Sequence, residues 1–139
     1  MDATRPLSPL RLLIIDDDEA IQTLMKALFR RANVVIDSAG DGEAGLRKIR
    51  HQHYDAILLD LMLPLVNGFE VIREIKSRDL PTLRHVVVLT AASDRTLRDF
   101  RDGGLVRRVM RKPFDMEDLM DEVLACASAR DTSAEARVH

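Results

Sequence analysis

The sequence predicts an α/β fold, a five-stranded doubly wound parallel sheet in a three-layer arrangement with helices on both faces. Five short apolar runs, rich in β-branched residues, alternate with segments whose apolar residues recur at helical spacing. This alternation is typical of parallel sheets with right-handed crossovers, and for five strands we expect the order 2-1-3-4-5. At 139 residues and 46% hydrophobic content, the chain has the size of one domain with a real core.

Three segments are expected along the chain. Residues 10–126 should form the folded domain, residues 1–9 a disordered lead, and residues 127–139 a flexible tail. The amino terminus has an acid at position 2 and no apolar core segment, so it is not a secretory signal. No apolar run approaches the roughly 20 residues that cross a bilayer, so we expect no membrane association.

Charge and cysteine content exclude several classes of protein. The net charge of −2 comes from 23 acidic and 21 basic residues, which favours neither nucleic acid nor an anionic membrane as a partner, and no motif supports direct nucleic-acid binding. Cys126 is the one cysteine of the chain, so no internal disulfide forms, and no Cys/His spacing suggests zinc. We therefore expect a cytoplasmic protein.

The first half of the chain contains three predicted strands, each an apolar run: Leu10–Ile15, Val34–Asp37 and Tyr54–Leu59. The helix after the first strand is predicted from apolar residues at i, i+3, i+4 and i+7, with acidic residues before them and basic residues after them, as the helix dipole prefers: Ile21, Leu24, Met25 and Leu28. Asp41-Gly42 introduces the second helix, which has a thin apolar stripe at Leu46 and Ile49.

The second half continues the alternation. A helix is predicted over residues 68–77, a strand over His85–Leu89, closed by Thr90, and a fifth strand over Val106–Arg111. Between these strands, residues 93–102 form the weakest predicted helix, with only Leu97 and Phe100 apolar, and we expect it to be mobile. Asp115 should cap a last helix with apolar residues at the same spacing as in the first: Met116, Leu119, Met120 and Val123.

Charged and hydroxyl residues follow four of these strands at the point where each ends. Asp16 and Asp17 follow the first strand, Asp60 the third, Thr90 the fourth and Lys112 the fifth. Because the carboxyl ends of parallel strands meet at one edge of the sheet, we expect these side chains to converge. Each carboxylate pair at about 4 Å costs about 4 kcal/mol at an effective dielectric of about 20, so a cation must lie among them.

The kind of ligand and the lysine indicate the chemistry. Hard oxygen ligands without His or Cys select Mg²⁺, and Lys112 adds a second positive charge. With that charge neutralised, Asp60 can act as a nucleophile toward a phosphoryl group, and Thr90 can donate a hydrogen bond to a phosphoryl oxygen. The alternative to such a functional site is a set of solvated charges at strand ends with no shared role.

Over about residues 10 to 126 the chain resembles the receiver domain of two-component response regulators, which has a flavodoxin-like fold. Four motifs in order carry the resemblance: LLIIDDD, AILLDLMLPLVNG, VVVLTAAS and MRKPF. The resemblance implies a phosphoacceptor, metal-site acids, a metal ligand from the main-chain carbonyl of residue 62, switch and phosphate-binding residues, and a cis peptide bond before Pro113. By this resemblance Asp60 would be the phosphoacceptor, and the metal-site residues would be Asp16, Asp17, Asp60 and Met62. The switch and phosphate-binding residues would be Thr90, Ala91 and Lys112.

Two positions depart from the family's pattern. Val109 stands three residues before Lys112, where the family usually has an aromatic residue, so an aromatic rotamer switch is in doubt. Gly104 lies eight residues before Lys112 instead of seven, which puts the geometry of this loop in doubt.

The function that the resemblance implies is a phosphorylated signalling switch. A histidine kinase or phosphotransfer protein would phosphorylate Asp60 with Mg²⁺ as cofactor, and the surface over residues 91–111 would change to control a downstream protein or a second receiver. Such a domain is no enzyme beyond its own phosphoryl transfer and a slow dephosphorylation. Slow hydrolysis is expected because neither Met62 nor Ala92 can orient a water molecule.

Three alternatives were weighed against this function. A flavodoxin-like cofactor binder needs a small, hydroxyl-rich phosphate loop after strand one, where this chain has three aspartates. A phosphatase of the haloacid-dehalogenase type needs a second aspartate at the position of Met62. A pseudo-receiver that acts only as a protein-interaction module stays open as the second interpretation.

Overall fold

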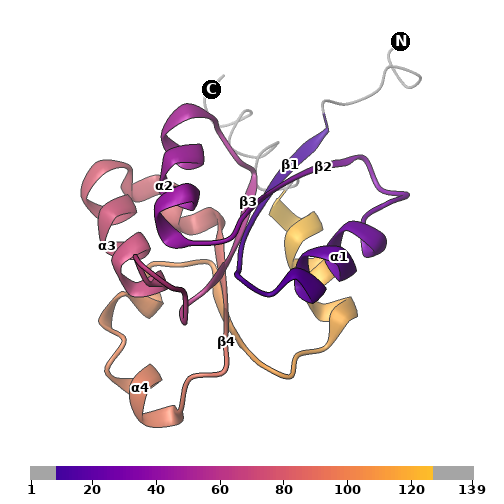
Figure 1. Ribbon diagram of the computed structural model, residues 1–139. Coiled ribbons are helices and arrows are strands. Elements are labelled where there is room, and N and C mark those ends of the chain that lie inside the picture. Colours follow the sequence, from indigo (N-terminus) through magenta and orange to yellow (C-terminus); the bar gives the residue numbers. More distant parts are fainter. Residues whose placement is uncertain (1–8, 127–139) are drawn as a thin grey trace, which may run out of the picture.

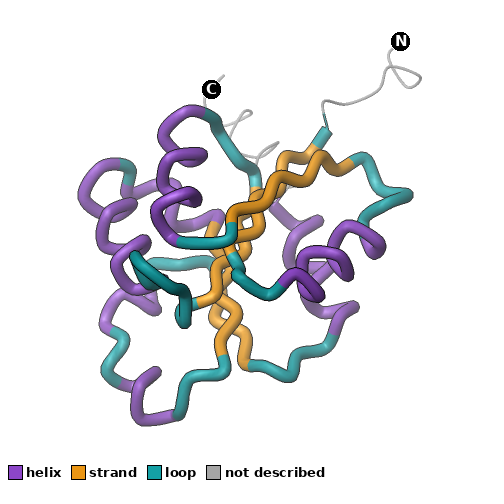
Figure 2. Tube along the Cα trace, in the orientation of Figure 1, coloured by secondary structure: helices purple, strands orange, loops and turns teal. Residues whose placement is uncertain are grey.

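The computed structural model describes residues 9–126 and contains the predicted sheet. All pairings are parallel and the strand order is β2-β1-β3-β4-β5, which confirms the predicted topology. Figures 1 and 2 show the twisted sheet between two layers of helices. The strands are β1 (Leu10–Ile15), β2 (Val34–Ala39), β3 (Ala56–Asp60), β4 (Val86–Thr90) and β5 (Arg108–Arg111).

Helical segments connect the strands. The α-helices are α1 (Glu19–Leu28), α2 (Gly42–His51), α3 (Gly68–Arg78), α4 (Asp94–Arg98) and a C-terminal helix over residues 116–126, and the short 3-10 helices are η1 (Leu80–His85) and η2 (Arg101–Gly104). In the described part of the chain, no helix has the length and apolarity needed to span a bilayer.

The two faces of the sheet bury alternate residues of the same strands. Leu13 and Ile15 of β1 pack with residues of α2 and α3, whereas Leu12 and Ile14 pack with residues of α1 and the C-terminal helix. Since successive side chains of a strand point to opposite faces, an apolar run without alternation is what a sheet covered on both sides requires. The central strands β1, β3 and β4 are therefore buried almost throughout.

Short polar side chains cap the helices where they begin. Asp18, Asp41, Asn67 and Ser93 each accept a hydrogen bond from a backbone N–H in the first turn of the helix that follows. The predicted cap Asp115 accepts from the N–H of Asp118 at 3.1 Å, which confirms it. Each cap satisfies a donor that has no partner within its helix.

Three strands differ from their predicted bounds by one or two residues: β2 extends to Ala39, β3 covers Ala56–Asp60 and β4 covers Val86–Thr90. Two further elements also differ in extent. The helix expected over residues 93–102 is the five-residue α4 followed by η2, and neither buries a residue, so no packed face sustains a longer helix. The fifth strand begins at Arg108, two residues later than predicted, although the N–H of Arg107 already bonds the carbonyl of Val86. The predicted lead, apart from residue 9, and the tail over 127–139 lie outside the described residues.

Candidate functional site

Three carboxylates meet at the carboxyl edge of the sheet. β1 and β3 are neighbours with Ile15 opposite Leu59, so Asp16 after β1 comes beside Asp60 at the end of β3. Each of Asp16, Asp17 and Asp60 offers one oxygen, and these three oxygens lie within 4.8 Å of one another. Asp16 and Asp60 are buried and Asp17 is exposed, so the group opens to solvent on one side.

Backbone amides fix the two buried carboxylates. The N–H of Asp18 donates to Asp16 Oδ1 at 2.8 Å, and the N–H of Met62 donates to Asp60 Oδ1 at 2.9 Å. Asp16 Oδ2 has no hydrogen-bond partner although it is buried. Burying a charged oxygen without a partner is costly, and this burial raises the pKa of Asp16 against the lowering effects of the Asp18 N–H and of Lys112.

Lys112 reaches the cluster from the strand on the other side of β4. Its Nζ lies 3.6 Å from Asp16 Oδ2 and 3.5 Å from Asp60 Oδ2. The backbone N–H of Lys112 donates to the carbonyl of Thr90 at 2.8 Å. Three ionised carboxylates and one ammonium leave a charge of −2. The donor set consists of hard oxygens and the charge is uncompensated, so these residues fit a divalent cation such as Mg²⁺.

Thr90 ends β4 directly beside the site. β3 and β4 pair with Asp60 opposite Leu89, which puts the fully buried Thr90 next to the end of β3. Its Oγ1 accepts a hydrogen bond from the N–H of Ala92 at 2.9 Å, so the hydroxyl still has its own proton to donate. The Lys112–Pro113 peptide bond is cis, as the resemblance implies.

A closed loop links the site to α3. It runs over residues 61–67, and its ends are joined because the N–H of Gly68 donates to the carbonyl of Leu61 at 3.0 Å. Gly68 packs so closely that a Cβ there would lie 2.5 Å from Leu61 Cα and 2.6 Å from the Asp60 carbonyl oxygen. Its φ is not positive, so it is close approach that requires glycine in this motif.

The six arginines between residues 95 and 111 divide into two groups. Arg107 and Arg108 pair with acids of the C-terminal helix, Arg108 holding Asp118 with two hydrogen bonds of 2.7 and 2.8 Å, and Arg111 pairs with Asp94. The other three are exposed and form no ion pair with any described residue: Arg95, Arg98 and Arg101. A docking surface would therefore draw its free positive charge from the α4 and η2 region.

Val109 is half-buried and lines a hollow of about 410 Å³ near this surface. The hollow is bounded by the α4 to β5 segment, through Leu97, Phe100, Gly103, Gly104 and Arg111. Phe100 also packs edge to face on Phe69 of α3 with ring centroids 5.3 Å apart. The valine leaves open the space that a larger side chain would fill.

Two polar groupings were missed by reading the sequence. Gln22 of α1 donates through Nε2 to the Asp16 carbonyl at 2.8 Å, although its position reads as solvated helix surface. At the other end of the sheet, Asp37 accepts from the Tyr54 hydroxyl at 2.7 Å and from Gln52 at 3.1 Å. Burial and Asp37 raise the pKa of Tyr54 to about 12. No local sequence pattern predicts these hydrogen bonds, because each joins residues of different segments.

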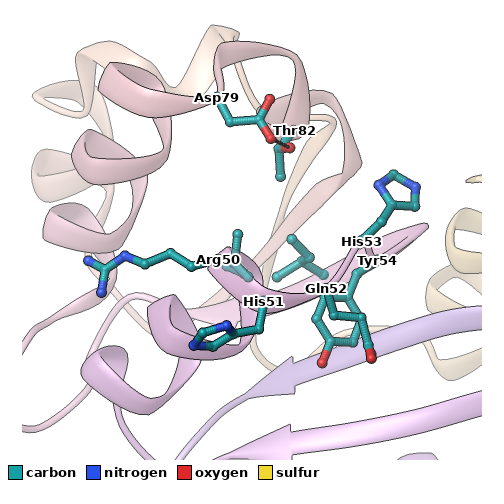
Figure 3. A pocket seen from close by; sticks show the side chains of 9 residues that line it. Arg50, His51, Gln52, His53, Tyr54, Asp79 and Thr82 are labelled. Atoms are coloured by element: carbon teal, nitrogen blue, oxygen red, sulfur yellow. Dashed lines mark hydrogen bonds between the residues drawn. The ribbon is translucent and has the colours of Figure 1, made fainter.

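A separate hollow of about 310 Å³ lies at the amino ends of β3 and β4. Figure 3 shows the side chains of Arg50, His51 and His53 pointing in different directions there. The Thr82 hydroxyl donates a hydrogen bond of 2.6 Å to Asp79 Oδ2. Because its polar groups do not converge, this hollow is not arranged as a catalytic or metal site.

Comparisons with known proteins agree with this geometry. The response regulator receiver domain family matches residues 12–124. Response regulator ArlR of Staphylococcus aureus is 32% identical over 116 residues, 83% of this chain and 51% of ArlR. The transcriptional regulatory protein AfsQ1 of Streptomyces coelicolor is 43% identical over 84 residues, 60% of this chain and 36% of AfsQ1. The chain thus spans about half or less of the length of these curated relatives.

Solved structures of receiver domains also resemble this chain. The response regulator protein TrrA of Thermotoga maritima, solved in complex with Mg²⁺ and BeF, superposes with a TM-score of 0.72 at 28% identity, covering 84% of this chain and 98% of TrrA. A CheY-like receiver domain protein of Methanospirillum hungatei has a TM-score of 0.79 at 22% identity, covering 91% of this chain and 99% of its own, and shows the fold alone.

The fold and the acidic edge define a class of phosphoryl-accepting α/β signalling domains. This chain belongs to the response regulator receiver domain family of two-component systems, whose members interact with histidine kinases.

Proposed function

We propose that Asp60 of this chain accepts a phosphoryl group from the phosphohistidine of a histidine kinase or phosphotransfer protein, with Mg²⁺ as cofactor. The observation that carries the proposal is the cluster of three carboxylates in which Asp16 Oδ2 is buried without a hydrogen bond and Lys112 lies between Asp16 and Asp60. A purely structural cluster would leave this charge uncompensated. We place the reaction in the cytoplasm, where such kinases present their phosphohistidine.

In the transfer, an Asp60 carboxylate oxygen forms the new bond to phosphorus while the phosphorus–nitrogen bond of the donor breaks. The electron pair stays on the imidazole nitrogen, and no redox partner is needed. Mg²⁺, held by Asp16, Asp17, Asp60 and the main-chain carbonyl of Met62, would neutralise charge on the phosphoryl oxygens.

The remaining residues hold the product. Lys112 Nζ, 3.5 Å from Asp60 Oδ2, is placed to pair with one phosphoryl oxygen. The Thr90 hydroxyl and the N–H of Ala91, both at the end of β4, are the proposed donors to another. The Met62 N–H keeps Asp60 Oδ1 in place, which leaves Oδ2 as the oxygen that attacks.

Phosphorylation by a small donor tests the proposal directly. With Mg²⁺, acetyl phosphate should add one phosphoryl group per chain, seen by intact-mass spectrometry, and chelation of the metal should abolish the gain, because the cluster then has no cation to offset the incoming charge. Absence of the adduct in excess Mg²⁺ would mean that the chain is a pseudo-receiver, the second candidate, which acts only through protein contacts.

We infer that phosphorylation is read out over residues 91–111. Thr90 would draw in residues 91–93, and the short α4 and η2, which bury no residue, offer little resistance to rearrangement. Val109 has one stiff rotamer and a small area, so it adds little to the switch. The exposed arginines of this region would then dock a downstream protein or a second receiver.

Hydrogen exchange measures this readout. Beryllofluoride with Mg²⁺ should change the protection of residues 91–106 in the parent, and Lys112→Ala should lose that change while keeping its fold, because the fixed ammonium is gone. Protection changes restricted to the acidic site in the parent would place the output surface elsewhere.

The phosphorylated state should be long-lived. Met62 and Ala92 flank the path of an attacking water, and neither side chain can orient it. Met62 is largely exposed, so Met62→Asn should be tolerated and should speed hydrolysis by about tenfold, less than the roughly 100-fold or more of a positioned acid or base, because an amide orients water without taking its proton. The loss of the phosphoryl adduct over time, followed by mass, checks this, and an unchanged or slower rate would refute it.

A further inference from the structure

Leu65 has two unusual properties at once. Among the described residues it is the non-glycine residue with a positive φ, 62°, and at 79% it is the most exposed large apolar side chain. Leucine is disfavoured in this left-handed region, which glycine and asparagine adopt readily. The chain therefore accepts backbone strain in order to hold an apolar side chain in water.

The surrounding loop fixes Leu65 firmly. Leu61 and Leu63 are buried, the loop ends are joined by the bond from the Gly68 N–H to the Leu61 carbonyl, and Asn67 caps α3. Leu65 is thus presented by an anchored loop that starts at Asp60. In the same loop, Met62 is 62% exposed, the next highest value for a large apolar side chain in the described chain.

A partner that reaches Asp60 has to cover this loop. Asp60 is only 6% exposed, so a phosphohistidine comes within bonding distance only if its protein lies closely over the opening. The exposed apolar side chains of Met62 and Leu65 lie in the loop that follows Asp60, and exposed acids follow β1: Asp17, Asp18 and Glu19. The rim therefore combines an apolar side with an acidic side.

We propose that Leu65, with Met62, forms the apolar contact for the protein that donates the phosphoryl group. This inference rests on the proposed function of Asp60. The complementary partner surface has an apolar patch next to its phosphohistidine and basic side chains facing Asp18 and Glu19, the exposed acids that the metal site does not use. Backbone strain at a functional surface is common where the surrounding structure holds it in place, as this loop does.

The test compares two donors on the variant Leu65→Asn. Asparagine tolerates the same backbone and removes the apolar surface, so the variant should fold at least as well as the parent. Its phosphorylation rate with acetyl phosphate should stay within about twofold of the parent. With the kinase or phosphotransfer protein that phosphorylates the parent fastest, kcat/KM should fall about tenfold through KM, the effect of losing one buried leucine contact.

Leu80→Asn is the matched control, since Leu80 is 50% exposed at the start of η1, before β4 and away from the acidic edge. Leu80→Asn should leave the rates with acetyl phosphate and with the protein donor unchanged. Leu65→Met keeps an apolar side chain and should therefore react with the protein donor like the parent. Unchanged transfer to Leu65→Asn, or an equal loss with both donors, would overturn the contact. Failure of the parent itself to react with acetyl phosphate would instead refute the proposed function of Asp60.

Discussion

An Asp60→Asn protein will gain no phosphoryl group from acetyl phosphate and Mg²⁺ under conditions in which the parent is fully modified. Asparagine keeps an oxygen to accept the Met62 N–H, so the loop stays in place, but its amide is no nucleophile. It also removes one of the three negative charges of the acidic cluster, on which the proposed binding of Mg²⁺ depends. Intact mass after equal incubation gives the answer without knowledge of the natural partner.

Asp121→Asn is the control for this substitution, because Asp121 is an exposed aspartate of the C-terminal helix. Asp121→Asn should react like the parent. A phosphoryl group on Asp60→Asn equal to that on the parent would show that another residue is the acceptor, and peptide mapping would identify it.

Gly68→Ala will destabilise the fold and slow phosphorylation together. The new Cβ would meet backbone atoms, Leu61 Cα at 2.5 Å and the Asp60 carbonyl oxygen at 2.6 Å, which cannot rotate away as a side chain would. Relief requires the loop to move away from α3, and overpacking of this kind costs about 1–3 kcal/mol, or more where backbone is involved. Because one of the displaced atoms belongs to Asp60 and the other to the next residue, the reaction with acetyl phosphate should also slow.

Urea denaturation of both proteins measures the first effect. Gly40→Ala supplies the comparison, since a Cβ at Gly40 would meet nothing within 4 Å and its φ is not positive. That change should stay within about 0.5 kcal/mol of the parent. Equal stability of Gly68→Ala and the parent would show that the loop is looser than its contacts indicate.

The sheet and the convergence of its polar strand ends could be predicted from the sequence. Apolar runs covered on both faces have no alternation, which distinguishes β1, β3 and β4 from surface strands. Each run ends at a polar residue, so topology alone brings Asp16, Asp60 and Lys112 to one edge. These features are readable because they depend on periodicity and strand order.

Three other features could not be predicted from the sequence, because they depend on tertiary contacts or on a disfavoured backbone conformation. The length of α4 is set by the absence of a buried face, whereas its sequence reads as one longer helix. Asp16 Oδ2 lacks a hydrogen bond because the Asp18 N–H bonds Oδ1 and Lys112 Nζ stays 3.6 Å from Oδ2. Leu65 takes a backbone conformation that its residue type disfavours, so residue propensity would predict a negative φ at this position.

The ion pairs of β5 also bear on how the protein behaves at high concentration. Among residues 9–126, β5 pairs with β4 alone and leaves one side of its backbone without a strand, the kind of edge on which a second chain can add and start a growing assembly. This edge is four residues long and has an arginine at each end, Arg108 tied to Asp118 and Arg111 to Asp94. Charge and brevity thus protect the sheet against aggregation at β5.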